Sequence, residues 1–136
     1  MKQFFTIHGG EYLLGNIIEK KFPDWEIWIP SKDLGTDFLI TNKKNRQKNV
    51  SIQVKSSKDY LVFPHKPEEK KRYRSLGWWS LNLSKIKDSS ANFWIFVIES
   101  AEERVLDCII IEKEELYKRI RTVHGSKNGV KIYRTI

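Results

Sequence analysis

The sequence predicts an α/β fold in which helices flank a central β-sheet. Segments that alternate β-branched and polar residues, such as 50–56, occur together with helical patterns at 11–21 and 112–123. A nearly continuous apolar run at 93–98 has the composition of a central strand that is covered on both faces. A chain of 136 residues can bury a sizeable core in a single domain, which we expect to span residues 1–136.

The first sixty residues predict one helix followed by three strands. The helix, residues 11–21, carries a predicted apolar stripe of Tyr12, Leu13, Ile17 and Ile18, and Pro23 marks its end. The strands are expected at 25–29, 35–41 and 50–56. Because a loop at 42–49 returns the chain, the second and third strands should form an antiparallel hairpin.

Polar side chains of that hairpin form a candidate site. In the strand 50–56, one face should pack while the other presents Gln53 and Lys55, whose Cα atoms lie about 7 Å apart. Asp37 enters the neighbouring strand and can lie beside them. Glu11 reaches the group only if its helix packs across the sheet. The competing interpretation is a set of polar residues on the solvent face of an exposed hairpin.

The second half of the chain predicts further strands and short helices. Residues 57–75 are irregular, although 68–74 can form one or two helical turns. Beyond them we expect an extended segment at 78–83, a short helix at 84–89 capped by Ser84, strands at 93–98 and 106–111, a helix at 112–123 and an edge strand at 130–133. We expect Trp78 and Trp79 in the core or a dimer contact rather than in base stacking.

Glu11, Asp37 and Gln53-x-Lys55, in this order, resemble the PD-(D/E)xK signature of the restriction-endonuclease-like nucleases. The similarity is to Holliday-junction-resolvase-like and small uncharacterised members, and it covers the first 60 residues or so, with the later strands similar only in pattern. Two positions depart from the signature, since Thr36 precedes Asp37 and Gln53 replaces the second acid. The resemblance implies a restriction-endonuclease-like core with a central mixed sheet flanked by helices, in the order αβββαβ.

The resemblance also implies an activity, a Mg²⁺-dependent DNA endonuclease in which Mn²⁺ can substitute. Its catalytic residues would be Glu11, Asp37, Gln53 and Lys55, of which the first three would hold the metal through oxygen atoms. Lys55 would stabilise the charge that develops on the phosphoryl group. A homodimer is expected on the same basis. The main alternative is a nucleic-acid-binding subunit that has lost catalysis, for which Gln53 is the reason, and an interaction domain without catalysis comes third.

The charge distribution points to a polyanionic partner. The net charge is +8, and the basic residues that we expect to contact nucleic acid are Lys43, Lys44, Arg46, Lys58, Lys70, Lys71, Arg72 and Arg74. Residues 117–134 add six basic residues and no acid, whereas 99–115 holds seven acids and two bases. This asymmetry predicts a basic face and an acidic back.

Cysteine, histidine and hydropathy limit the remaining possibilities. The single Cys108 is expected to be a buried apolar side chain, which fits a reducing cytoplasm. One cysteine with three scattered histidines makes no zinc site, although His8 could orient Glu11. No apolar run has the roughly 18 to 20 residues of a membrane span, so we expect a soluble, cytoplasmic protein.

Overall fold

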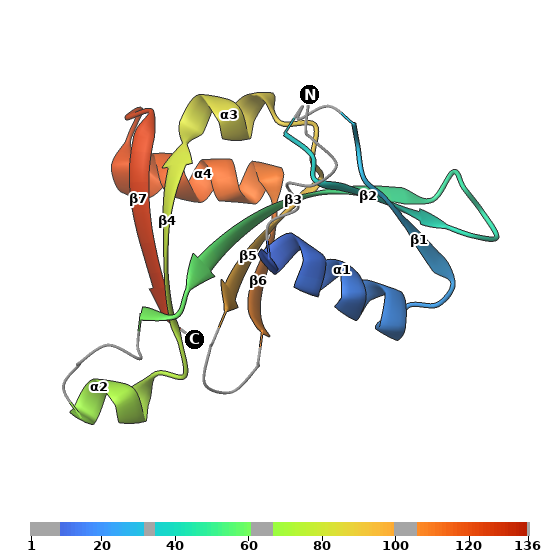
Figure 1. The fold of residues 1–136 in the computed structure, drawn as a ribbon. Helices are drawn as coiled ribbons and strands as arrows, with labels where there is room; N and C mark the ends of the chain where they lie inside the picture. Colours follow the sequence, from blue (N-terminus) through green and yellow to red (C-terminus); the bar gives the residue numbers. More distant parts are fainter. Residues whose placement is uncertain (1–8, 32–34, 61–66, 100–105, 136) are drawn as a thin grey trace.

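The computed structural model describes residues 9–31, 35–60, 67–99 and 106–135, which form two sheets and four helices (Figure 1). The elements, in order, are α1 (Gly9–Lys21), β1 (Trp25–Trp28), β2 (Phe38–Asn42), β3 (Asn49–Lys58), α2 (Pro67–Arg72), β4 (Leu76–Asn82), α3 (Leu83–Asp88), β5 (Phe93–Glu99), β6 (Leu106–Glu112), α4 (Lys113–His124) and β7 (Gly129–Thr135). The protein is therefore an α/β protein, as its sequence predicts. Within the described ranges, no helix is both long enough and apolar enough to cross a membrane.

The central sheet is mixed and has the strand order β1-β2-β3-β5-β6. β3 and β5 run parallel, and the other neighbouring pairs are antiparallel. The hairpin expected from the sequence is confirmed, because β2 pairs with β3 from Phe38↔Ile52 to Thr41↔Asn49. The strand expected at 130–133 is part of β7, which pairs with β4 in a separate two-stranded sheet.

Two apolar clusters pack on opposite faces of the central sheet. On one face, α1 places Leu14 and Ile18 over side chains of β2, β3 and β5. On the other face, α3, α4 and the β4–β7 sheet enclose the second cluster, which includes Trp79 and Phe96. β5 contributes alternate residues to both clusters, which confirms that the run at 93–98 is a central strand.

The buried face of α1 differs from the predicted apolar stripe. Leu14 and Ile18 are buried, whereas Tyr12 and Leu13 are exposed. The reason is a close approach at Gly10, where an added Cβ would lie 2.0 Å from Ser56 Oγ and 2.9 Å from Glu99 Oε1. Because successive residues of a helix turn by about 100°, Tyr12 lies about 200° around α1 from Gly10 and points away from the sheet. Glu11, between them, is buried.

Gly10→Ala is expected to lower the free energy of unfolding by about 1–3 kcal/mol, the usual cost of forcing extra atoms into a packed site. Gly9→Ala is the matched control, since its added Cβ would lie 3.6 Å from Glu99 Oε2, an ordinary contact. Urea unfolding followed by circular dichroism measures both variants. Equal stability of the two variants would contradict the close packing of α1 on β3.

Two further expectations are wrong in detail. The short helix α3 is capped by Asn82, whose side chain accepts a hydrogen bond from Lys85 N, rather than by Ser84. Cys108 is exposed rather than buried, because it lies on β6, an edge strand of the central sheet. Partial burial of the thiol and the neighbouring Asp107 nevertheless raise the pKa of Cys108, so it is a poor nucleophile at neutral pH.

Candidate active site

A cleft of about 970 Å³ brings together the four side chains of the sequence motif. Glu11 comes from the first turn of α1, Asp37 from the entry to β2, and Gln53 and Lys55 from β3. The opposite wall belongs to β4 and α3 and includes Ser80, Asn82, Ser84 and Lys85. The four predicted residues therefore share one cavity.

Asp37 is buried and is held by β3. Its Oδ2 accepts a hydrogen bond from Val54 N at 2.7 Å and another from the side-chain amide of Gln53. Pairing between β2 and β3 ends at Phe38↔Ile52, so the Asp37 carboxylate takes the backbone N–H that a longer β2 would have bound. The carboxylate is thus fixed at the point where β3 leaves its neighbour.

Gln53 is only 6% exposed, which argues against the competing interpretation that it lies on the solvent face of an exposed hairpin. Its neighbour in the sheet is Trp94 on β5, and β4 packs across the following residues of β3. A second layer therefore covers this face of β3 where the sequence pattern predicts an open one. The orientation of the amide, with nitrogen toward Asp37, gives Gln53 a donor role in the structure.

Residues beside Asp37 form a hydrogen-bonded clamp. Thr36 Oγ1 lies 2.8 Å from Ser90 Oγ, and Ser89 Oγ donates to Gly35 O at 2.7 Å. Gly35 adopts φ 76°, a conformation that favours glycine. These contacts tie the turn before β2 to the connection between α3 and β5. Thr36 thereby restrains the backbone next to Asp37.

Lys55 projects toward an aromatic side chain of β5. Its Nζ lies 5.8 Å from the centre of the Trp94 ring, within the range of a cation–π interaction. The backbone of Lys55 is also held, because Trp79 Nε1 donates to Lys55 O at 3.0 Å. The Lys55 side chain is therefore restrained both at its backbone and at its ammonium group, and it lines the cleft.

Glu11 is buried at the α1 end of the cleft, and a second acid that the sequence motif does not include lies there. Glu99, at the end of β5, lines the same cleft and is the sheet neighbour of Lys58. The acidic stretch that begins at this residue was expected on the back of the molecule. The only sequence signal was the position of Glu99 at the end of a strand predicted to be central.

The basic residues expected to contact nucleic acid occupy different parts of the molecule. Lys58 lines the cleft. Lys43, Lys44 and Arg46 lie in the turn between β2 and β3, at the opposite end of β2 from Asp37. Arg72 ends α2, which projects from the lower left of Figure 1, and Arg74 forms an ion pair with Asp107. The side chains of Lys70 and Lys71, and the whole of His8, lie outside the described residues.

The cleft combines two buried carboxylates, an amide and an ammonium group. In the described ranges, no group of three or more His, Cys, Asp or Glu side chains is arranged to hold a metal ion. A metal site with three protein ligands would therefore need the amide oxygen of Gln53 beside the carboxylates of Glu11 and Asp37. Compared with known proteins, the chain matches no protein-family model, no curated protein and no solved structure.

Proposed function

We propose that the chain is a metal-dependent DNA endonuclease with a restriction-endonuclease-like core. One observation carries this proposal: Glu11, Asp37, Gln53 and Lys55, which are distant in sequence, line a single cleft. The order of the central elements supports it as well, since α1, β1, β2, β3, a helix and β5 follow the αβββαβ order when α2 and β4 are treated as additions. A cytoplasmic homodimer, each subunit cutting one strand, is part of the proposal.

The donor set fits Mg²⁺, a hard cation that prefers oxygen ligands and keeps several waters. Asp37 and Glu11 would supply carboxylate oxygens, and Gln53 would supply its amide oxygen after a 180° rotation of the amide. When bound, the cation would lower the pKa of a water molecule and polarise the phosphate. Mn²⁺ has similar ligand preferences and would substitute.

Two lysines of the cleft would bind the phosphates of the substrate in different ways. Lys55 would stabilise negative charge on the phosphoryl oxygens, which is worth most when the donor is held in place beforehand. The Trp94 ring and the Trp79 hydrogen bond provide this restraint. Lys58 would bind a flanking phosphate, since it lines the same cleft two residues beyond Ser56 on β3.

A second candidate function is favoured by the hydrogen bond from Gln53 to Asp37. The hydrogen bond from the amide already stabilises the negative charge of the Asp37 carboxylate, so this carboxylate gains less from a bound cation. The chain would then be a nucleic-acid-binding subunit without catalysis. The two functions differ in one property, which is whether the wild-type protein cleaves DNA when a divalent cation is added.

The deciding experiment incubates the protein with supercoiled plasmid, branched DNA and single strands in Mg²⁺, Mn²⁺ or EDTA. Cleavage that requires the cation is expected, and Lys55→Ala should reduce its rate by roughly 10²–10³-fold, the loss typical of removing one preorganised charge-stabilising group. Lys87→Ala is the matched control, because Lys87 is an exposed lysine of α3 that does not line the cleft. Binding of DNA without cleavage in either metal would select the second function.

A further inference from the structure

Trp28, at the end of β1, is an exposed aromatic residue that is held in one orientation. It is 49% exposed, yet its Nε1 donates to Thr41 Oγ1 at 2.9 Å. The guanidinium of Arg46 lies 5.9 Å from the centre of its ring. A flat ring that is fixed in orientation and half open is the kind of surface on which another ring can stack.

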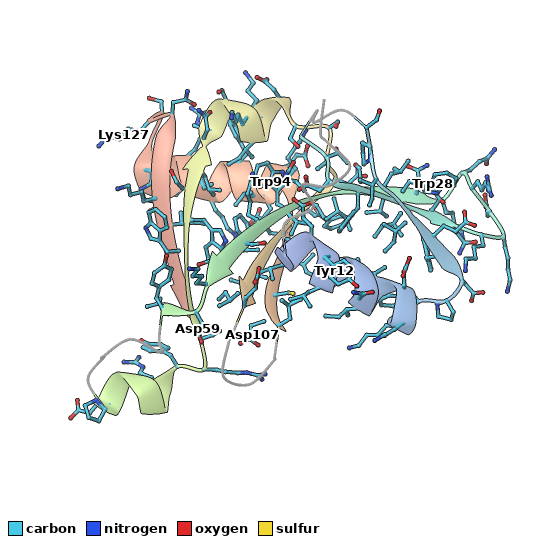
Figure 2. All side chains as sticks on the ribbon, in the orientation of Figure 1. Tyr12, Trp28, Asp59, Trp94, Asp107 and Lys127 are labelled. Carbon is cyan, nitrogen blue, oxygen red and sulfur yellow. The ribbon has the colours of Figure 1, made fainter. Side chains whose placement is uncertain are left out.

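Trp28 lies on the same face of the sheet as Gln53 and Lys55 of the candidate active site. It pairs with Leu39, which pairs with Ser51, and Ser51 precedes Gln53 by two residues on β3. Paired residues point to the same face of a sheet, as do residues i and i+2 of one strand. α1 packs on the opposite face, against Phe38, Ile40 and Ile52. Figure 2 labels Trp28 on the β1–β2 arm and Tyr12 on α1.

The distance between Trp28 and Gln53 suits a nucleic-acid strand that passes through the cleft. A strand spacing of about 4.8 Å and a rise of about 3.3 Å per residue place the Cα atoms of Trp28 and Gln53 roughly 12 Å apart. This corresponds to three or four nucleotides of a stacked strand at about 3.4 Å each. A phosphate beside Asp37 and Lys55 would therefore have a nearby base over Trp28.

The charges around Trp28 favour a phosphate-bearing partner. Arg46 contacts Glu26 at 3.6 Å and remains largely exposed, so its guanidinium can also reach a phosphate. The same turn carries Lys43, Lys44 and Lys48, whereas the acids in the described part of β1 and the turn before it are Asp24, which pairs with Lys44, and Glu26. A basic arm that presents a fixed aromatic ring has the two components of a site for single-stranded nucleic acid.

We propose that Trp28, Thr41 and Arg46 form a stacking platform for an unpaired base of the nucleic-acid substrate, close to the phosphate that is cleaved. The platform rests on the proposed function and narrows it to substrates with a single-stranded segment or a frayed end. In an intact duplex the bases stack on one another, so a side chain cannot stack on them unless they are exposed. Phosphate contacts alone would not make this distinction.

The test is binding of fluorescein-labelled oligonucleotides of one sequence, in EDTA, as a single strand, a blunt duplex and a duplex with a single-stranded tail. Trp28→Ala should weaken binding of the single strand and the tailed duplex by roughly 5- to 150-fold, the range found when a base-stacking aromatic is removed. Binding of the blunt duplex should change little. Trp28→Phe should keep most of the affinity because it retains a ring.

Tyr12→Ala is the matched control, since Tyr12 is 62% exposed but belongs to α1, on the opposite face of the sheet. Its affinity for all three oligonucleotides should equal that of the wild type. Unchanged binding by Trp28→Ala, or an equal loss for all three oligonucleotides, would overturn the platform. So would a change in sedimentation showing that Trp28 lies in a contact between two copies of the chain.

Different results would contradict the stacking platform and the proposed nuclease function. If Mg²⁺-dependent plasmid cleavage is present while Trp28→Ala binds single strands normally, only the platform is wrong. If the wild type binds none of the oligonucleotides, both are wrong. Quenching of 2-aminopurine placed in the single-stranded tail gives a second readout, because stacking on Trp28 should quench it and Trp28→Ala should restore its fluorescence.

Discussion

Asp37→Asn is expected to reduce DNA cleavage by roughly 10²–10³-fold or more while leaving DNA binding intact. The Asp37 carboxylate is held in the cleft by Val54 N and the Gln53 amide. Asparagine keeps an oxygen that can accept one of these hydrogen bonds but lacks the charge that a divalent cation needs. Plasmid nicking in Mg²⁺ and oligonucleotide binding in EDTA measure the two effects separately.

The stability of Asp37 variants separates the charge of this residue from its structural role. Asp37→Ala leaves the Val54 N–H without its acceptor, and an unsatisfied buried donor costs about 1–3 kcal/mol. Asp37→Asn should lose less, and Asp24→Asn, at an exposed acid, should lose almost nothing. Urea unfolding measures all three. Nicking by Asp37→Asn at the wild-type rate would remove Asp37 from the active site.

Gln53→Glu is expected to make the stability of the protein depend on divalent cations. The Gln53 amide contacts Asp37, so the substitution would place two buried carboxyl groups side by side. Mutual repulsion raises the pKa of the introduced carboxyl, and the folded state then binds more protons than the unfolded state. The free energy of unfolding in EDTA should therefore fall as the pH rises above the usual range for glutamate.

Adding Mg²⁺ should restore the stability of Gln53→Glu, because a cation between the two carboxylates removes the repulsion. At a concentration 100 times the dissociation constant, binding to the folded state alone adds about 2.7 kcal/mol. Gln47→Glu, in the exposed turn after β2, is the matched control and should respond to Mg²⁺ only as much as the wild type does. Thermal unfolding with Mg²⁺ or EDTA gives the comparison. Absence of metal binding by both the wild type and Gln53→Glu in calorimetry would contradict a metal site.

The part of the site that the sequence predicts correctly depends on neighbours along the chain. The β2–β3 hairpin brings Asp37 to Gln53 because one turn sets its register. Glu11 joins them only through the packing of α1, which depends on the contact between Gly10 and Ser56. The spacing of apolar residues gives no information about that contact, so the sequence wrongly predicts Tyr12 on the buried face of α1.

The burial of Gln53 also could not be predicted from its strand alone. Alternation within β3 predicts one packed face and one open face, and a separate layer decides whether the open face is covered. That layer is the sheet of β4 and β7, whose strands pair across more than forty residues of intervening chain. The exposed Cys108 reflects the converse case, an edge strand with part of one face uncovered.

The pairing of β4 with β7 has a consequence for the order of folding. In the described part of the chain, β4 has β7 as its only strand partner, so its ladder forms after a loop containing α3, β5, β6 and α4 has closed. Closing such a loop costs entropy before any contact compensates for it, and contacts between distant residues slow folding. The β2–β3 hairpin can form early, with Trp79 and the β4 wall of the cleft joining late. An intermediate would thus hold Asp37 beside Gln53 before Lys55 is held in place.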